Sequence, residues 1–227
     1  MSDVVEKLVH GPGYALLTGI GVDGLDDEQL ERAAIEVAGR VGTLVPQGPD
    51  GALTKHVRDV GLDPAEVTTY SYQHSGPLGF HADPTDVVAL LCVRPARSGG
   101  LSVIVRSAAV HDALAEERPD LARALYEPFW FNRRTGSGPH PVYAVDNGRL
   151  RVSYGPDLMR PDGLSALHRE ALDALGRLHH DDRFRIEMDL RPGDMQFLNN
   201  HLVLHSRTAY QDDPARPRHL IRLWLTL

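Results

Sequence analysis

The sequence has very little cysteine and no long apolar run, and each absence excludes a class of protein. Cys92 is the single cysteine in 227 residues, so the chain cannot form an internal disulfide. No apolar stretch is long enough to span a bilayer, and the first residues lack the basic and apolar regions of a secretory signal peptide. We therefore expect a protein of a reducing, cytoplasmic compartment.

Positive charge is also scarce. The formal net charge is −7, and Lys7 and Lys55 are the only lysines. This balance gives no reason to expect binding to nucleic acid or to an anionic membrane surface. We expect small molecules or proteins as partners, and the sequence does not predict an oligomeric state.

Short segments of strand composition predominate along the chain. They cover residues 14–18, 67–72, 87–93, 101–105, 142–145, 150–153, 184–190, 195–198 and 219–225. A first helical pattern begins at Asp26 or Asp27. Two more cover 108–126, with a break near Pro119, and 164–178. Residues 42–62 are rich in glycine and proline and predict a loop. Many strands with few helices favour a closed or sandwiched antiparallel β architecture, in one domain over 1–227.

Two imidazoles and one carboxylate come from distant parts of the chain. His81 and Asp83 are two residues apart between predicted strands, so they share a face and can converge on one ion. His205 follows the apolar residues 202–204 and lies at or near a strand. His201 shares that strand face, and spacing alone leaves the choice between them open. Such a set suits Fe(II), because it leaves positions for a co-substrate and dioxygen.

Each of these residues also has an ordinary structural explanation. About one His-x-Asp tripeptide is expected by chance in a chain of this composition. Two further instances, both in residues 179–182, fall at the end of a predicted helix and are interpreted as a solvated helix terminus. An isolated histidine is more often a core residue than a ligand. The alternatives to an enzyme are a non-catalytic metal-binding jelly-roll protein and a carboxylate-binding regulatory protein.

Arg218 and Arg222 are predicted on one face of the last strand among apolar neighbours. An arginine on a buried face needs an anion, and its planar fork suits a carboxylate. The alternative is internal pairing with Asp194, Asp212 or Asp213.

Several separated motifs, in this order, resemble the taurine dioxygenase (TauD/TfdA-type) family of iron(II)- and 2-oxoglutarate-dependent oxygenases. They are the segments 80–83, 90–96 with 98–100, 191–200, 205–208 and 218–222. The resemblance runs from about residue 70 to the C-terminus. It implies a mainly β fold with flanking helices, a double-stranded β-helix (a cupin-like jelly roll), with iron at one open end.

The resemblance also implies roles for individual residues. His81, Asp83 and His205 would be the catalytic iron ligands, which decides against His201. Arg218 would bind the distal carboxylate of 2-oxoglutarate, with Ser102 assisting, and Arg222 would contact substrate or co-substrate.

Because halogenating relatives lack the carboxylate at the position of Asp83, its presence favours hydroxylation. The implied reaction hydroxylates a C–H bond of a small polar metabolite, an amino acid derivative or a biosynthetic intermediate, and releases succinate and CO2. Desaturation or cyclisation at the same iron is the alternative outcome.

Substrate contacts are predicted among polar and aromatic residues that flank the motifs. For Tyr72 and Trp130 packing in the core is the favoured alternative, and His111 and His168 are interpreted as residues of helix surfaces. The candidates are Tyr70, Tyr72, His74, Arg106, Trp130 and Arg133.

Overall fold

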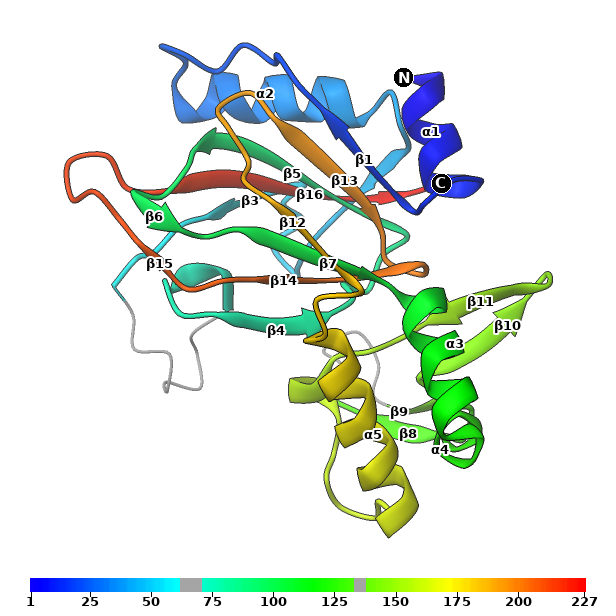
Figure 1. Ribbon diagram of the computed structural model, residues 1–227. Coiled ribbons are helices and arrows are strands. Elements are labelled where there is room, and N and C mark those ends of the chain that lie inside the picture. The colour runs from blue at the N-terminus through cyan, green and yellow to red at the C-terminus, as the bar shows by residue number, and fades with distance from the viewer. Residues whose placement is uncertain (62–70, 133–137) are drawn as a thin grey trace.

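Two antiparallel sheets face each other in the computed structural model, which describes residues 1–61, 71–132 and 138–227 (Figure 1). In the larger sheet the order is β1 (Tyr14–Leu17), β13 (Met195–Asn199), β5 (Val87–Arg94), β16 (His219–Thr226) and β2 (Thr43–Val45), and β3 (Thr54–Val57) also pairs with β16. In the smaller sheet the order is β12 (Arg185–Met188), β7 (Ser102–Arg106), β14 (Val203–Arg207) and β4 (Leu78–His81).

The chain crosses repeatedly from one sheet to the other. β3 and β5 lie in the larger sheet with β4 between them in sequence, and β13 and β16 alternate with β14 in the same way. Apolar side chains from both sheets meet between them: Val88 and Leu198 from the larger sheet contact Ile104 and Val203 from the smaller. This arrangement confirms the predicted mainly β fold and its double-stranded β-helix.

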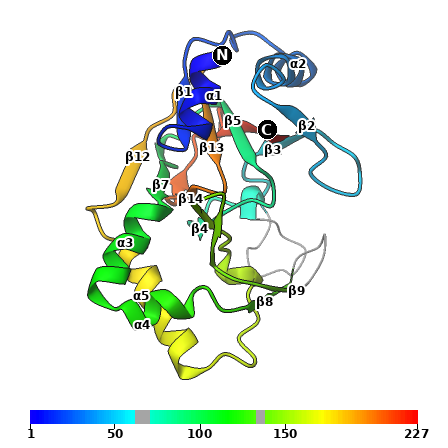
Figure 2. The ribbon, with the colours of Figure 1, turned by 90° about the vertical axis from the view of Figure 1, so that its right-hand side faces the viewer.

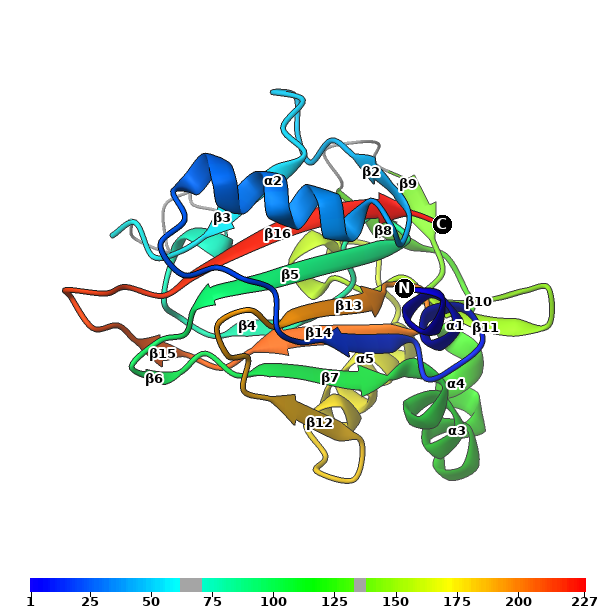
Figure 3. The ribbon, with the colours of Figure 1, turned by 90° about the horizontal axis from the view of Figure 1, so that it is seen from above.

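The outer face of the larger sheet is covered by α1 (Ser2–Val9) and α2 (Asp27–Ala38). Seen from above, α2 runs over β5 and β16 (Figure 3). Val87, Ala89 and Leu91 face these helices, whereas Val88 faces the other sheet. Strand β5 is therefore apolar on both faces, which explains the continuous apolar run in the sequence.

Helix α2 begins where the sequence predicts. The Asp26 side chain accepts a hydrogen bond from the backbone N–H of Gln29, and the Gln29 side chain accepts one from the backbone N–H of Asp26. This capping box satisfies two N–H groups that the first turn would leave without partners. The buried positions Leu30, Ala34 and Ala38 form the stripe that contacts the sheet.

A second apolar cluster lies beside the smaller sheet and is built by the helices and hairpins of the chain's middle third (Figure 2). The predicted break near Pro119 is confirmed, since one helix ends and the next begins at Arg118. Asn147 and Gly148 have φ of 50° and 75°, the left-handed conformation that a tight hairpin turn requires. The elements are α3 (Ser107–Glu117), α4 (Pro119–Ala124), β8 (Phe129–Phe131), β9 (Gly138–His140), β10 (Tyr143–Asp146), β11 (Arg149–Val152) and α5 (Ala166–His179).

Two short strands and two short turns complete the described elements. The strands β6 (Ser98–Gly99) and β15 (Tyr210–Gln211) pair with each other. Single 3₁₀ turns are formed by Ser71–Gln73 and Pro156–Leu158. Among the described residues, no helix has the length and apolar character needed to cross a membrane.

Three expectations from the sequence are wrong. The predicted loop 42–62 contains β2 and β3, because pairing with β16 outweighs its glycine and proline content. In the predicted strand 67–72, residues 67–70 lie outside the described residues and Ser71–Gln73 form a 3₁₀ turn. His179 is not a solvated helix end: it is 1% exposed and contacts the rings of Phe80 and Tyr154.

Candidate active site

Strand register brings the two predicted histidine ligands together. β4 ends at His81, and β14 pairs with it so that His205 lies directly opposite. The two imidazole rings have centroids 4.2 Å apart. Asp83 follows two residues after His81, and its carboxylate oxygen Oδ2 lies 3.9 Å from His205 Nε2. One potential ligand atom from each of the three residues lies within 4.8 Å of the other two.

Hydrogen bonds around the three residues leave donor atoms available for a metal. His81 Nδ1 lies 2.9 Å from the carbonyl oxygen of Gly79, so Nδ1–H donates there and the lone pair belongs to Nε2. Trp224 Nε1–H donates to Asp83 Oδ2 at 3.1 Å, which leaves Oδ1 for another partner. Partners of this kind orient metal ligands and fix the histidine tautomer.

The charge states also suit a metal. Burial lowers the pKa of His205 to about 3, with a further contribution from His81, so its imidazole is neutral at neutral pH. For Asp83, burial alone would raise the pKa, but Arg222, His205 and His81 outweigh it and the pKa is lowered. Two imidazoles and one carboxylate form the donor set that fits Fe(II) in an open site.

A cavity lies between the two sheets next to His81 and His205. Its lining includes two of the predicted co-substrate residues, Arg218 and Ser102, which are 5% and 8% exposed. Ser102 Oγ donates to Gln196 Oε1 at 2.9 Å. The lining consists of Val57, Tyr72, Leu78, His81, Leu90, Ser102, Leu190, His205, Ser206, Arg207, Arg218, Leu220 and Arg222.

Arg218 is buried without a counter-charge. Its Nη1 has no hydrogen-bond partner in the described part of the chain, and its guanidinium lies 5.0 Å from the centre of the Tyr210 ring. Among the predicted alternatives, Asp212 accepts a hydrogen bond from the backbone N–H of Arg218, and Asp194 accepts one from the backbone of Arg191. Neither forms an ion pair with the Arg218 guanidinium in the described ranges.

Arg207 is a second buried cation in this cavity, and the sequence analysis did not select it. Its Nη2 donates to the carbonyl oxygens of His74 and Gly76, whereas Nε and Nη1 have no partner among the described residues. Burial and the neighbouring Arg218 lower the pKa of Arg207 to about 10. The sequence does contain an indication of this position, because Arg207 lies two residues after His205 on a strand and so shares its face.

Arg222 lies between two aromatic rings beside the candidate iron ligands. Its guanidinium carbon is 5.2 Å from the centre of the Tyr72 ring and 5.1 Å from that of Trp224. Nη1 is 3.6 Å from Asp83 Oδ1, and Nε donates to Gln47 Oε1 at 2.9 Å. The structure thus brings Arg222 and Tyr72 to the site that the sequence predicts.

The other predicted residues are placed differently. His201, the rival ligand, bonds through Nε2 to Asp86 Oδ1 at 2.8 Å, outside the three-residue cluster. His74 adjoins the site through its carbonyl bond to Arg207. Arg106 is exposed and lines a separate depression with Gly11 and Leu202.

The two remaining substrate candidates, Tyr70 and Arg133, lie outside the described residues. Trp130 is 44% exposed, so the favoured interpretation as a core residue is wrong. His111 and His168 are partly buried on α3 and α5. Each makes a hydrogen bond there, to Tyr126 and Glu127 respectively.

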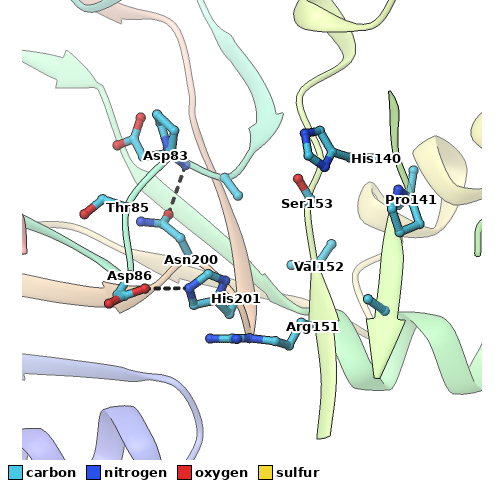
Figure 4. A pocket seen from close by; sticks show the side chains of 14 residues that line it. Asp83, Thr85, Asp86, His140, Pro141, Arg151, Val152, Ser153, Asn200 and His201 are labelled. Carbon is cyan, nitrogen blue, oxygen red and sulfur yellow. Dashed lines mark hydrogen bonds and ion pairs between the residues drawn. The ribbon is translucent and has the colours of Figure 1, made fainter. Parts of the chain in front are cut away.

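A larger cavity of about 470 Å³ lies on the other side of the segment that carries Asp83 (Figure 4). The Asp86–His201 pair and Asn200, which accepts a hydrogen bond from the backbone N–H of Asp83, form one wall. His140 and Ser153 lie across from them (Figure 4). This volume is in the range of small-molecule sites, and the walls combine apolar side chains with several polar and charged ones.

Comparisons with known proteins agree with the motifs. Residues 2–224 match the family described as "Taurine catabolism dioxygenase TauD, TfdA family". The chain is 28% identical to FR-33289 synthase from Streptomyces rubellomurinus over 246 residues, which cover all of this chain and 73% of that protein. It is 35% identical to uridine-5'-phosphate dioxygenase from an Amycolatopsis species over 152 residues, or 59% of this chain and about half (52%) of the relative.

Solved structures share the fold. Asparagine oxygenase in complex with Fe(II), 3-hydroxyasparagine and succinate superimposes with a TM-score of 0.81 at 22% identity, over 99% of this chain and 78% of that one. The non-heme iron oxygenase OrfP, in complex with Fe and alpha-ketoglutaric acid, gives a TM-score of 0.75 at 18% identity, over 99% of this chain and 78% of OrfP. The predicted resemblance and fold class are confirmed.

Proposed function

The chain belongs to the TauD and TfdA family of dioxygenases, and from that premise we propose that it hydroxylates a small polar metabolite at an iron centre held by His81, Asp83 and His205. Family membership confirms the predicted class, a non-heme iron oxygenase that uses iron(II) and 2-oxoglutarate. The observation that supports the assignment of residues is the convergence of three donor atoms next to a cavity that contains unpaired, buried arginine nitrogens.

Each ligand is held in place by a neighbour. Gly79 fixes the His81 ring so that Nε2 can bind the metal, and Trp224 holds one oxygen of Asp83. Arg222 keeps Asp83 ionised. When bound, iron and 2-oxoglutarate would supply the oxidation chemistry: dioxygen is consumed, one of its oxygen atoms enters the succinate formed as the keto acid loses CO2, and the other enters a substrate C–H bond.

The co-substrate is a diacid, and the cavity offers cations for it. Arg218 is the anchor for the distal carboxylate, because it is buried and its Nη1 lacks a partner in the described chain. Ser102 assists through its hydroxyl, and Arg207 adds a second positive charge. Charge-assisted hydrogen bonds in such a dry site are roughly twice as strong as neutral ones.

The larger cavity next to Asp83 is the proposed substrate site. Its walls carry polar side chains, among them Ser153 and His140, that can hydrogen-bond a small polar molecule. Relatives named for asparagine and for uridine-5'-phosphate indicate the compounds to test first. The cytoplasm is the proposed location, because a reducing compartment keeps iron ferrous.

The test measures succinate formed from 2-oxoglutarate with Fe(II), with and without amino acids, nucleotides and other small phosphorylated compounds. Substrate-dependent succinate and a product heavier by one oxygen atom support the proposal. His205→Ala is expected to abolish both activity and keto-acid-dependent iron binding. His201→Ala is the matched control for iron binding, and if it abolishes that binding while His205→Ala preserves it, the ligand assignment fails.

A further inference from the structure

A second cluster of potential metal ligands lies on the opposite face of the larger sheet, under the first turns of α2. It consists of Asp27, Glu31, His56 and His219. None of these residues lines the cavity of the candidate iron site. His219 is 4% exposed, so its imidazole is shielded from water.

Strand pairing and helix spacing explain why the four side chains meet. β3 and β16 pair so that His56 lies opposite Ile221, which makes His219 its diagonal neighbour on the same face. Asp27 and Glu31 are four residues apart on α2 and continue the stripe of Ala34 and Ala38 toward the N-terminus. Both carboxylates therefore project toward the sheet where the two histidines lie.

The distances define which atoms face one another. His56 Nε2 lies 2.7 Å from Glu31 Oε1, so Nε2–H donates to the carboxylate and Nδ1 keeps its lone pair. His56 Nδ1 lies 2.6 Å from His219 Nε2. Asp27 offers a carboxylate oxygen within 4.8 Å of a nitrogen of each histidine. Three potential ligand atoms from three elements thus lie within 4.8 Å of one another.

We propose that Asp27, His56 and His219 bind a structural divalent transition metal, for which Zn²⁺ is the best match. Two imidazoles and one carboxylate are common zinc ligands, and a water molecule completes a tetrahedron. Glu31 is then the carboxylate that receives the second ring N–H of a metal-bound histidine, an arrangement typical of zinc sites.

The local charges permit a cation. Asp27 and Glu31 supply two negative charges, while Arg58 Nη2 lies 3.7 Å from Asp27 Oδ2. That ion pair is exposed, so giving up the contact costs little. The bound ion would join α2 to β3 and β16 at the residue that follows Arg218, and would stabilise the strand that carries the co-substrate anchor.

Metal stoichiometry tests the proposal directly. Full-length protein without an affinity tag is stripped with a chelator and titrated with Zn²⁺ by calorimetry, and bound zinc is counted by elemental analysis. We expect two equivalents for the wild type, one at the candidate iron site and one here. His56→Ala and Asp27→Asn should each lose one equivalent, and His205→Ala should retain the one bound by the second cluster.

His168→Ala is the matched control, because His168 is likewise a partly buried histidine that pairs with a carboxylate, that of Glu127, at 2.7 Å, and it belongs to neither cluster. It should keep two equivalents. Asp27 is exposed, so Asp27→Asn tests the site without threatening the fold. The proposal is overturned if the wild type binds no zinc that His205→Ala retains, or if Asp27→Asn and His56→Ala both keep the second ion at wild-type affinity. Anomalous scattering at the zinc edge should place a peak between Asp27, His56 and His219.

Discussion

Replacing Arg218 with methionine should weaken 2-oxoglutarate binding strongly and, in the absence of the co-substrate, stabilise the fold. Arg218 is buried in the cavity, and this burial lowers the pKa of its guanidinium.

 Arg218 is 5% exposed, and no carboxylate of the described residues forms an ion pair with its guanidinium. Arg207 lies on the same Tyr210 ring, so the two cations repel each other in a site shielded from water.

The magnitude follows from the burial of the anchor. Removing one partner of a buried, hydrogen-bonded charge pair costs roughly 2–5 kcal/mol, which is a rise of about 30-fold to several thousand-fold in Kd. Calorimetry with 2-oxoglutarate and a redox-silent metal at the iron site measures this change. Thermal unfolding without the keto acid should show a higher Tm for Arg218→Met, since an unpaired buried cation is removed.

Arg118→Met is the control, because Arg118 is an exposed arginine whose ion pairs with Asp120 and Glu170 lie outside the cavity. It should bind 2-oxoglutarate as the wild type does. If Arg218→Met also binds 2-oxoglutarate with wild-type affinity, the guanidinium does not anchor the diacid and the reasoning from its burial is refuted.

Three further predictions concern the neighbours of the site and the fold. Trp224→Phe removes the hydrogen bond to Asp83 and should weaken metal affinity at the iron site about 10- to 100-fold, measured by metal titration. Asp26→Ala removes the cap of α2 and should lower the free energy of unfolding by about 1 kcal/mol in urea denaturation, with Glu28→Ala on the same exposed turn as control. Burial lowers the pKa of His179 to about 3, so the folded state binds fewer protons than the unfolded state below about pH 6.5. Stability should therefore fall by about 1.4 kcal/mol per pH unit from this group as pH decreases toward 3, and His179→Leu should reduce that slope in unfolding curves between pH 4 and 6.

The grouping of His81, Asp83 and His205, the proposed iron ligands, could be predicted in part from the sequence because local rules decide much of its geometry. His81 and Asp83 share a face through the two-residue period of extended chain, and His205 sits on a strand that the apolar residues before it reveal. The choice of His205 over His201 needed the family resemblance, since both share the strand face. The structure supplies the physical difference: His205 lies opposite His81 in the strand register, whereas His201 precedes β14 and bonds to Asp86.

The second cluster, of Asp27, Glu31, His56 and His219, could not be predicted, because it depends on a strand that the local composition does not indicate. β3 lies in a segment rich in glycine and proline, and only its pairing with β16 identifies it as a strand. Without that register nothing in the sequence brings His56 next to His219, which are 163 positions apart. The same holds for Asp27, whose approach requires α2 to lie across the sheet. Sites formed within one strand motif can therefore be predicted from sequence spacing. Sites assembled across a sheet and its covering helix can be identified only from the tertiary structure.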